Sequence, residues 1–198
     1  MRNPNRVKNL RLRFLPFYVL GIVLLVTVRP GWTEYAVGLA AVVVGAALRT
    51  WGAGHLVKTT RLTITGPYAW LRHPLYLGTL LAGSGIAIMV GGWAAALLLA
   101  AFLPWFFLSY FPRKERTESA RLEEIYGEAF ARYRAEVPAL VPRLGSWSPS
   151  DVTLARADGD RRWSLARYSE NNELGTLLGL AACALAFGVR AAIVLGGA

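Results

Sequence analysis

The sequence has few charged residues and almost no cysteine. Only 17% of its 198 residues are charged, whereas a typical soluble domain carries roughly a quarter. Cys183 is the single cysteine, which excludes an intramolecular disulfide and a multi-cysteine metal site. It lies in an apolar run and is expected to be a small core residue. The sequence also lacks a fixed-period repeat and a glycine-rich dinucleotide-binding loop, so a soluble nucleotide-binding domain is not expected.

Long apolar blocks make up most of the chain instead. They lie at about 14–28, 32–57, 75–110 and 174–195, and a helix needs ~20 apolar residues to cross the hydrocarbon core. The third block is longer than one crossing requires and contains Gly91 and Gly92 near its middle, which predicts a helical hairpin. The predicted fold is an all-α, polytopic membrane bundle of about five transmembrane helices. The second block is rich in Gly and Ala, which permits close helix packing in lipid.

Basic residues gather in particular connections between the blocks. The net charge is +10, and eleven Arg and Lys residues lie between Arg113 and Asn172. At the ends of apolar blocks these residues would meet anionic lipid headgroups, and no basic surface typical of nucleic-acid binding remains. Their distribution predicts a cytoplasmic N-terminus, an outward C-terminus and a retained first span. The expected location is a bacterial inner (plasma) membrane.

The segment from Lys114 to Val137 mixes charged and apolar residues at helical spacing. This pattern predicts an amphipathic helix at the cytoplasmic membrane surface, and Pro112 with Arg113 is expected to end the preceding hairpin. Its expected apolar face consists of Leu122, Ile125, Tyr126, Ala129, Phe130, Tyr133 and Val137. We expect one domain over 1–198, with a core at 49–142, a loop at 145–173 carrying interfacial Trp147 and Trp163, and an additional C-terminal transmembrane helix at 174–195.

The stretch from Thr65 to Gly78 carries the most chemical information. Pro74 suits the first turn of a helix, so His73 should stand at the entrance of a transmembrane helix. Tyr76 and Gly78 would then lie just inside it, and Gly78 with Gly83 would leave room for a ligand or a neighbouring helix.

A cofactor with a sulfonium, an adenine and a zwitterionic tail needs an aromatic face, polar partners and a charged group. Tyr68, His73, Tyr76 and, on the following charged helix, Glu118 provide these residue types. Two other interpretations remain open from the residues alone. His73 could be an interfacial anchor, and Tyr68, Trp70 and Tyr76 could form an aromatic belt.

Two motifs resemble those of a known family. Residues Gly66 to Gly78 are similar to the Gly-Pro-Tyr…Arg-His-Pro-x-Tyr-x-Gly signature of the membrane methyltransferases that include isoprenylcysteine carboxyl methyltransferase and phospholipid methyltransferase. A second pattern of that family is matched by Glu118, Leu122, Tyr126, Gly127, Phe130, Tyr133, Val137 and Pro138. The resemblance covers about 49–142.

This resemblance implies that S-adenosylmethionine binds between the histidine-proline helix entrance and the glutamate-bearing helix. The cofactor-binding residues it implies are Tyr68, His73, Pro74, Leu75, Tyr76, Gly78 and Glu118. The sequence departs from the family pattern at three places, and at one of them Phe130 and Tyr126 exchange aromatic type. Ser119 stands where a second glutamate is frequent, for which Glu115 one turn earlier could compensate, and Ala139 replaces a frequent arginine.

Arg49 is a further candidate, because an arginine inside a transmembrane helix is costly unless it faces a partner or water. It could pair with an acidic group of the acceptor or with Glu118, or it could snorkel to the cytosolic face. Arg49 and Glu118 are the predicted catalytic residues.

The predicted function is methyl transfer from S-adenosylmethionine to a lipidic or prenylated acceptor, of the isoprenylcysteine carboxyl O-methylation type. The alternatives are a phospholipid N-methyltransferase, an NADPH-dependent membrane reductase of related architecture, and a noncatalytic membrane scaffold or small transporter. Membrane lipids are the other expected partners, with neither a metal nor nucleic acid, and the oligomeric state is left open.

Overall fold

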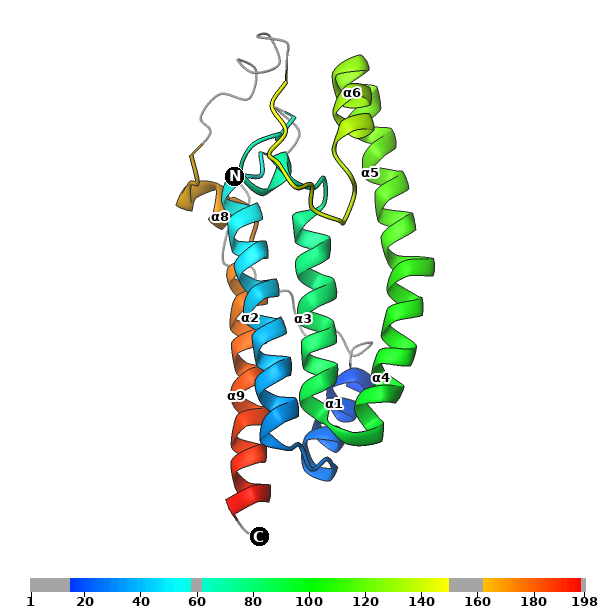
Figure 1. Ribbon diagram of the computed structural model, residues 1–198. Coiled ribbons are helices and arrows are strands. Elements are labelled where there is room, and N and C mark those ends of the chain that lie inside the picture. Colours follow the sequence, from blue (N-terminus) through cyan, green and yellow to red (C-terminus); the bar gives the residue numbers. More distant parts are fainter. Residues whose placement is uncertain (1–14, 58–61, 150–161, 197–198) are drawn as a thin grey trace.

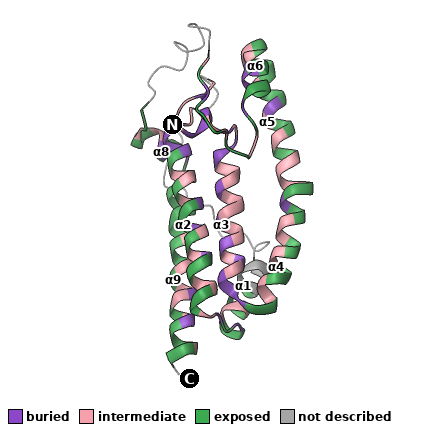
Figure 2. Ribbon diagram, in the orientation of Figure 1, coloured by how far each residue is buried: buried purple, intermediate pink, exposed green. Residues whose placement is uncertain are grey.

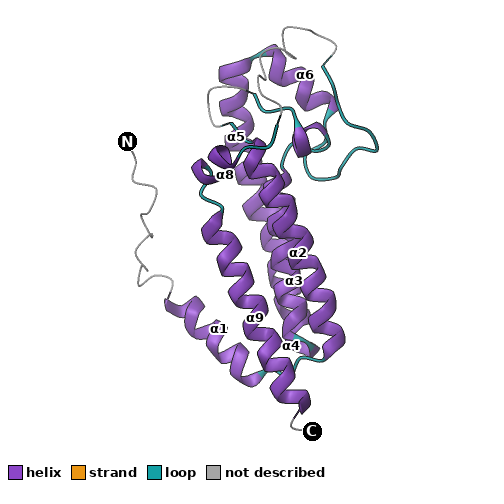
Figure 3. Ribbon diagram, turned by 90° about the vertical axis from the view of Figure 1, so that its left-hand side faces the viewer, coloured by secondary structure: helices purple, strands orange, loops and turns teal. Residues whose placement is uncertain are grey.

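The protein is a bundle of helices with a small helical cap at one end (Figure 1, Figure 3). The computed structural model describes residues 15–57, 62–149 and 162–196, and these ranges contain no strand. The elements are α1 Leu15–Thr27, α2 Trp32–His55, η2 Gly66–Ala69, α3 Pro74–Val90, α4 Gly92–Trp105, η3 Phe106–Tyr110, α5 Phe111–Tyr126, α6 Glu128–Glu136, α8 Leu165–Glu170 and α9 Leu174–Gly196. The predicted all-α class is confirmed.

Three helices of the described residues have the length and apolarity to cross a membrane. They are Trp32–His55, the continuous helix Gly92–Tyr126 and Leu174–Gly196. The shorter apolar helix α3 has 17 residues and α1 is described over 13. Large apolar side chains such as Trp93 and Leu108 point outward from the bundle, as expected where lipid rather than water surrounds a helix. Cys183 is exposed on α9 rather than buried, so the expectation of a core position was wrong.

Helices α2 and α3 pack backbone against backbone. A Cβ atom added to Gly45 of α2 would lie 2.6 Å from the carbonyl oxygen of Gly78 on α3. One to two turns away, a Cβ atom on Gly38 would lie 2.5 Å from the carbonyl oxygen of Gly85. Small residues at such interfaces let membrane helices approach closely, so the close approach predicted for the second block is confirmed.

The predicted hairpin is present, but its second helix does not end where expected. Gly91 and Gly92 adopt φ values of 76° and 55° between α3 and α4. From α4 the helix continues through the π-helical turn η3 into α5, in nearly the same direction (Figure 1). The wider turn, in which Phe111 N–H bonds to the Phe106 carbonyl, accommodates Pro112 without a stop. The charged segment is therefore an extension of a membrane helix and breaks only at Gly127, where φ is 50°.

An apolar cluster lies in the cap, where η2 is largely buried and α6 buries Phe130 and Tyr133 (Figure 2). It consists of Ile64, Phe130, Tyr133, Val137 and Trp147, with Leu62, Leu122 and Tyr126 packed against it. Most residues of the apolar face predicted for the segment from Lys114 to Val137 thus belong to this cluster. They pack inside the cap and not on the membrane surface, and Ile125 is exposed.

The two tryptophans of the predicted loop differ from expectation. Trp147 is buried in this cluster rather than interfacial, and its indole N–H donates to Glu136. Trp163 is partly exposed and donates to the carbonyl of Thr50 on α2. The short helix α8 follows it within the segment expected to be a loop.

The C-terminal helix α9, predicted as an additional span, packs along α2 and α1. Phe187 of α9 joins the main core with Val28, Val42, Met89 and Val90. The Arg190 side chain donates to the carbonyl oxygens of Val28 (3.0 Å) and Val26 (2.6 Å). These carbonyls end α1, where helical partners are missing, so Arg190 caps that helix.

Candidate functional site

The entrance to α3 is shaped by a tight turn. Gly66 adopts a φ of 60°, and a Cβ atom there would lie 2.5 Å from the buried ring of His55, so glycine is required on both counts. The 3-10 turn η2 follows, with a proline near its start. Pro74 then begins α3 and His73 precedes it directly, as the sequence predicted.

The two motif segments meet through their backbones. The N–H groups of Arg72 and His73 donate to the carbonyls of Pro138 (2.9 Å) and Ala139 (3.0 Å). The hydroxyl of Tyr133 donates to the carbonyl of Tyr68 at 2.7 Å. The segment after α6 is therefore fixed against the mouth of α3.

A buried charged cluster joins the mouth of α3 to α5. Arg72 donates to Glu115 at 2.6 Å and to the carbonyl of Val137 at 2.9 Å. The other Glu115 oxygen contacts the Nε2 atom of His73, and Ser119 donates to Glu115 at 3.2 Å. Ser119 is buried, so the residue that departs from the family pattern holds the carboxylate one turn earlier.

Glu118, one turn beyond Glu115, faces the same place. One of its oxygens accepts a hydrogen bond from the Tyr76 hydroxyl, and the other lies 3.7 Å from Nδ1 of His73. Its side chain is 46% exposed, unlike that of Glu115 at 17%. Tyr76 in turn contacts the ring of Tyr110 edge to face, with centroids 5.8 Å apart.

These groups surround a cavity of about 260 Å³, slightly below the roughly 300–1,000 Å³ usual for small-molecule sites. Of the residues predicted for the site, those lining it are Arg49, Tyr68, His73, Pro74, Leu75, Tyr76 and Glu118. Arg72 and Tyr110 line it as well. The structure thus brings together side chains from α2, η2, α3 and the α4–α5 helix.

Tyr68 has an unsatisfied hydroxyl at this cavity. Its oxygen is buried and finds no hydrogen-bond partner among the residues that the structure describes. Burial raises the pKa of Tyr68 well above its usual value, so the hydroxyl stays protonated. A buried donor without a partner is costly, and its position in the cavity wall suits a ligand acceptor atom.

Gly78 does not line this cavity, although it was predicted to bind the cofactor. Its Cα faces α2, because an added Cβ atom would lie 2.5 Å from Cγ of Arg49 and 2.7 Å from the carbonyl of Gly45. Gly83 faces the ring of Phe102 on α4 in the same way. Both glycines make room for a neighbouring helix, which was one of the two expected uses.

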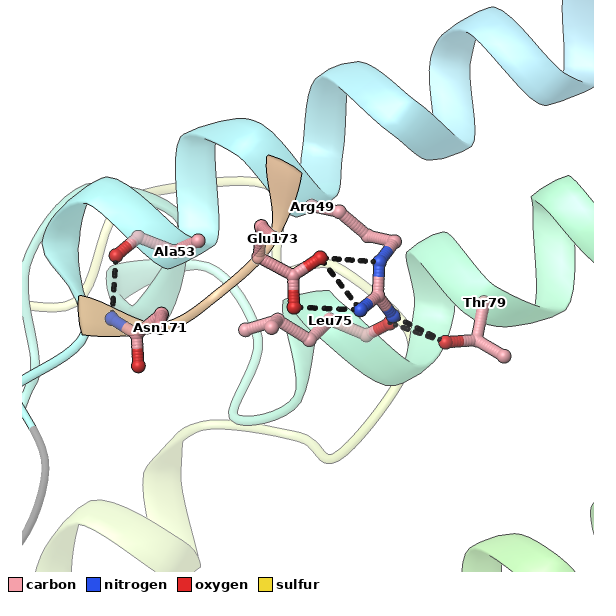
Figure 4. A network of polar contacts seen from close by, with 6 residues as sticks. All are labelled: Arg49, Ala53, Leu75, Thr79, Asn171 and Glu173. Atoms are coloured by element: carbon pink, nitrogen blue, oxygen red, sulfur yellow. Dashed lines mark hydrogen bonds and ion pairs between the residues drawn. The ribbon is translucent and has the colours of Figure 1, made fainter. Parts of the chain in front are cut away.

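Arg49 has a partner that the sequence did not indicate (Figure 4). Its guanidinium donates to both carboxylate oxygens of Glu173, the residue just before α9, at 2.7 to 3.0 Å. The expected pairing with Glu118 is wrong, and so is the snorkelling alternative, because the Arg49 side chain is only 16% exposed. Arg72, Tyr110 and Glu173 were not among the predicted site residues. A carboxylate directly before a transmembrane segment was the available signal for Glu173.

Comparison with known proteins finds a family resemblance for part of the chain. The sequence model of the phospholipid methyltransferase family matches residues 33–129. The chain is similar to this family over that segment, which is just under half of its length. The matched range contains α2, η2, α3 and the α4–α5 helix, and with them most of the cavity wall.

The individual proteins that resemble this chain are distant from it in sequence. It is 30% identical over 95 residues to the protein-S-isoprenylcysteine O-methyltransferase of Schizosaccharomyces pombe, covering 46% of this chain and 39% of that protein. It is 31% identical over 136 residues to the cobalt-zinc-cadmium resistance protein CzcN of Cupriavidus metallidurans, covering 65% and 61%. It is 28% identical over 137 residues to the protein-S-isoprenylcysteine O-methyltransferase B of Arabidopsis thaliana, covering 63% and 68%.

The matches leave part of the relatives' length without a counterpart. The chain spans about two fifths of the S. pombe protein and three fifths of the C. metallidurans protein. No solved structure matches the chain. Within the described residues, no group of three or more His, Cys, Asp or Glu side chains is arranged to hold a metal ion.

Proposed function

We propose that this protein is an S-adenosylmethionine-dependent methyltransferase that acts on a lipidic or membrane-embedded acceptor. The observation that carries the proposal is the convergence of His73, Tyr76 and Glu118 on one cavity at the mouth of an apolar helix. The match of residues 33–129 to the phospholipid methyltransferase family model supports the reaction class.

The side chains of the cavity fit the charges of this cofactor. S-adenosylmethionine, when bound, would supply a methyl group already activated by a sulfonium, and its amino acid tail adds an ammonium and a carboxylate. The half-exposed Glu118 suits a cationic group of the cofactor, and the rings of Tyr76 and Tyr110 offer faces that attract cations. The unpaired Tyr68 hydroxyl suits an acceptor atom such as a tail carboxylate or an adenine nitrogen.

The protein's part in such a reaction is alignment and exclusion of water. The Arg72–Glu115–His73 cluster fixes His73, and Tyr76 fixes Glu118 by its hydrogen bond. Orientation of two partners in this way supplies much of the rate enhancement for displacement reactions. No protein nucleophile is required, and Glu118 or His73 could take a proton from a protonated acceptor.

The names of two relatives support a lipidic acceptor, since both contain S-isoprenylcysteine and O-methyltransferase. Carboxyl O-methylation and phospholipid N-methylation both fall within the proposed class. A reductase that uses NADPH is less well supported, because that cofactor needs a cationic site for its extra phosphate. The two guanidinium groups that the structure describes along the cavity, those of Arg49 and Arg72, are already paired with carboxylates.

Isothermal titration of the purified protein with S-adenosylmethionine and with NADPH tests the proposal. We expect S-adenosylmethionine to bind and His73→Ala or Glu118→Ala to weaken it at least tenfold, while both variants remain folded. Glu124→Ala, on the exposed side of the same helix, is the matched control and should bind normally.

Binding of NADPH alone would contradict the methyltransferase proposal, and binding of neither compound would favour a noncatalytic scaffold. Normal S-adenosylmethionine binding by either alanine variant would remove that residue from the site. Mass spectrometry of lipid extracts incubated with methyl-labelled cofactor would then identify the acceptor.

A further inference from the structure

Arg49, which lines the cavity, forms a buried ion pair with Glu173. Arg49 lines the cavity from α2 and contacts the carbonyl of Leu75 (3.1 Å) and the hydroxyl of Thr79 (2.6 Å) on α3. These residues lie farther into α3 than His73, which stands at its entrance. The Arg49 end is therefore the inner end of the cavity, from which a membrane-embedded acceptor would approach.

Every N–H group of the Arg49 guanidinium has an acceptor. Nε and Nη2 donate to Glu173, and Nη1 donates to Leu75 and Thr79. The side chains of Arg49 and Glu173 are only 16% and 10% exposed. An acidic acceptor would thus have to displace a buried carboxylate that already makes a bidentate contact, and it would gain no additional charge attraction.

Glu173 is held in this position by the corner between α8 and α9. The side-chain amide nitrogen of Asn171 donates to the carbonyl of Ala53 at 2.8 Å (Figure 4). It also donates to the carbonyl of Leu56 at 3.0 Å, at the end of α2. Asn172 then adopts a left-handed φ of 56° and directs the chain toward Glu173. The corner lies outside the matched family segment, so the C-terminal part of this chain adds a charged group to a site built by the family core.

We propose that Glu173 is a specificity-determining residue that neutralises Arg49 and makes the site reject acceptors with an anionic reacting end. The acceptor group is then an amine, hydroxyl or thiol on an apolar body, rather than a carboxylate. This inference rests on the proposed methyltransferase function. It replaces the expectation from the sequence that Arg49 could pair with an acidic group of the acceptor.

Direct binding of two amphiphiles of equal chain length tests the inference. Equilibrium dialysis of the full-length protein in a nonionic detergent would compare radiolabelled decylamine with decanoate, each corrected for a detergent blank. We expect the wild-type protein to retain decylamine at least tenfold better than decanoate. Glu173→Gln should raise decanoate binding at least tenfold, and adding Arg49→Gln to it should remove that gain. Arg190→Gln, at the other end of α9 and remote from the cavity, is the control and should keep the wild-type preference.

Equal or better retention of decanoate by the wild-type protein would overturn the inference, even if Glu173→Gln failed to fold. An unchanged preference in a folded Glu173→Gln variant would also overturn it. Failure of the proposed function is separate, because it would appear as absent S-adenosylmethionine binding in titrations of the wild-type protein, which need no acceptor.

Discussion

Replacement of Gly45 by alanine should lower the stability of the bundle. The new Cβ atom would lie 2.6 Å from the Gly78 carbonyl oxygen and 2.8 Å from the Ala82 nitrogen, while ordinary contacts begin at 3.4 Å. Both neighbours are backbone atoms and cannot rotate away, so α2 and α3 must separate by the difference between 3.4 and 2.6 Å, which is 0.8 Å. Overpacking of this kind costs about 1–3 kcal/mol. At about 2–4 °C per kcal/mol for a protein of this size, the melting temperature should fall by roughly 2–12 °C.

The control for this variant is the same substitution at Gly179 of α9. No atom lies within 4 Å of a Cβ atom there, so alanine only improves helix propensity, by up to about 1 kcal/mol. Thermal unfolding of both variants in detergent, followed by circular dichroism, should therefore give shifts of opposite sign. A Gly45→Ala variant that melts at or above the wild-type temperature would refute the close backbone packing of α2 and α3.

Two further substitutions test the polar contacts at the N-terminal end of α3. Arg72→Gln leaves the carboxylate of Glu115 without its buried cation, and loss of a buried partner costs about 3–5 kcal/mol; the melting temperature should fall by more than in Gly45→Ala. The control is Arg132→Gln, because the ion pair of Arg132 is solvent-exposed; this variant should keep the wild-type melting temperature. Equal melting temperatures of the Arg72→Gln and Arg132→Gln variants would argue against a stabilising Arg72–Glu115–His73 cluster. Tyr76→Phe removes the hydroxyl that donates to Glu118 but keeps the ring; titration should show roughly tenfold weaker S-adenosylmethionine binding, and unaltered affinity would exclude that hydrogen bond from the site.

Local sequence rules predicted those parts of the structure that depend on local backbone geometry. Gly91 and Gly92 indicated the hairpin because the turn requires positive φ values, and Pro74 indicated the start of α3 because its missing N–H is harmless there. The proximity of His73 and Glu118 could be expected only from the family resemblance, since no local pattern relates two residues on separate helices.

The sequence-based predictions were wrong where the structure depends on a residue far away in sequence or on an irregular helical turn. A proline within a helix normally ends or bends it, but the π-helical turn before Pro112 lets the helix continue. No pattern of residues in the sequence predicts that turn. Arg49 required a buried acidic partner, yet Glu173 lies 124 residues away in sequence. Only the packing of the α8–α9 corner on α2 brings the two together.

Two of the hydrogen bonds that fix the chain after α6 to the N-terminal end of α3 join peptide groups only. The carbonyl of residue 139 accepts from the His73 N–H group whichever side chain the residue carries, so alanine is sufficient at this position. A change of side chain at residue 139 therefore leaves the hydrogen bond from the His73 N–H group intact. The side chain at this position can thus change without altering how the backbone positions the cavity-lining residues.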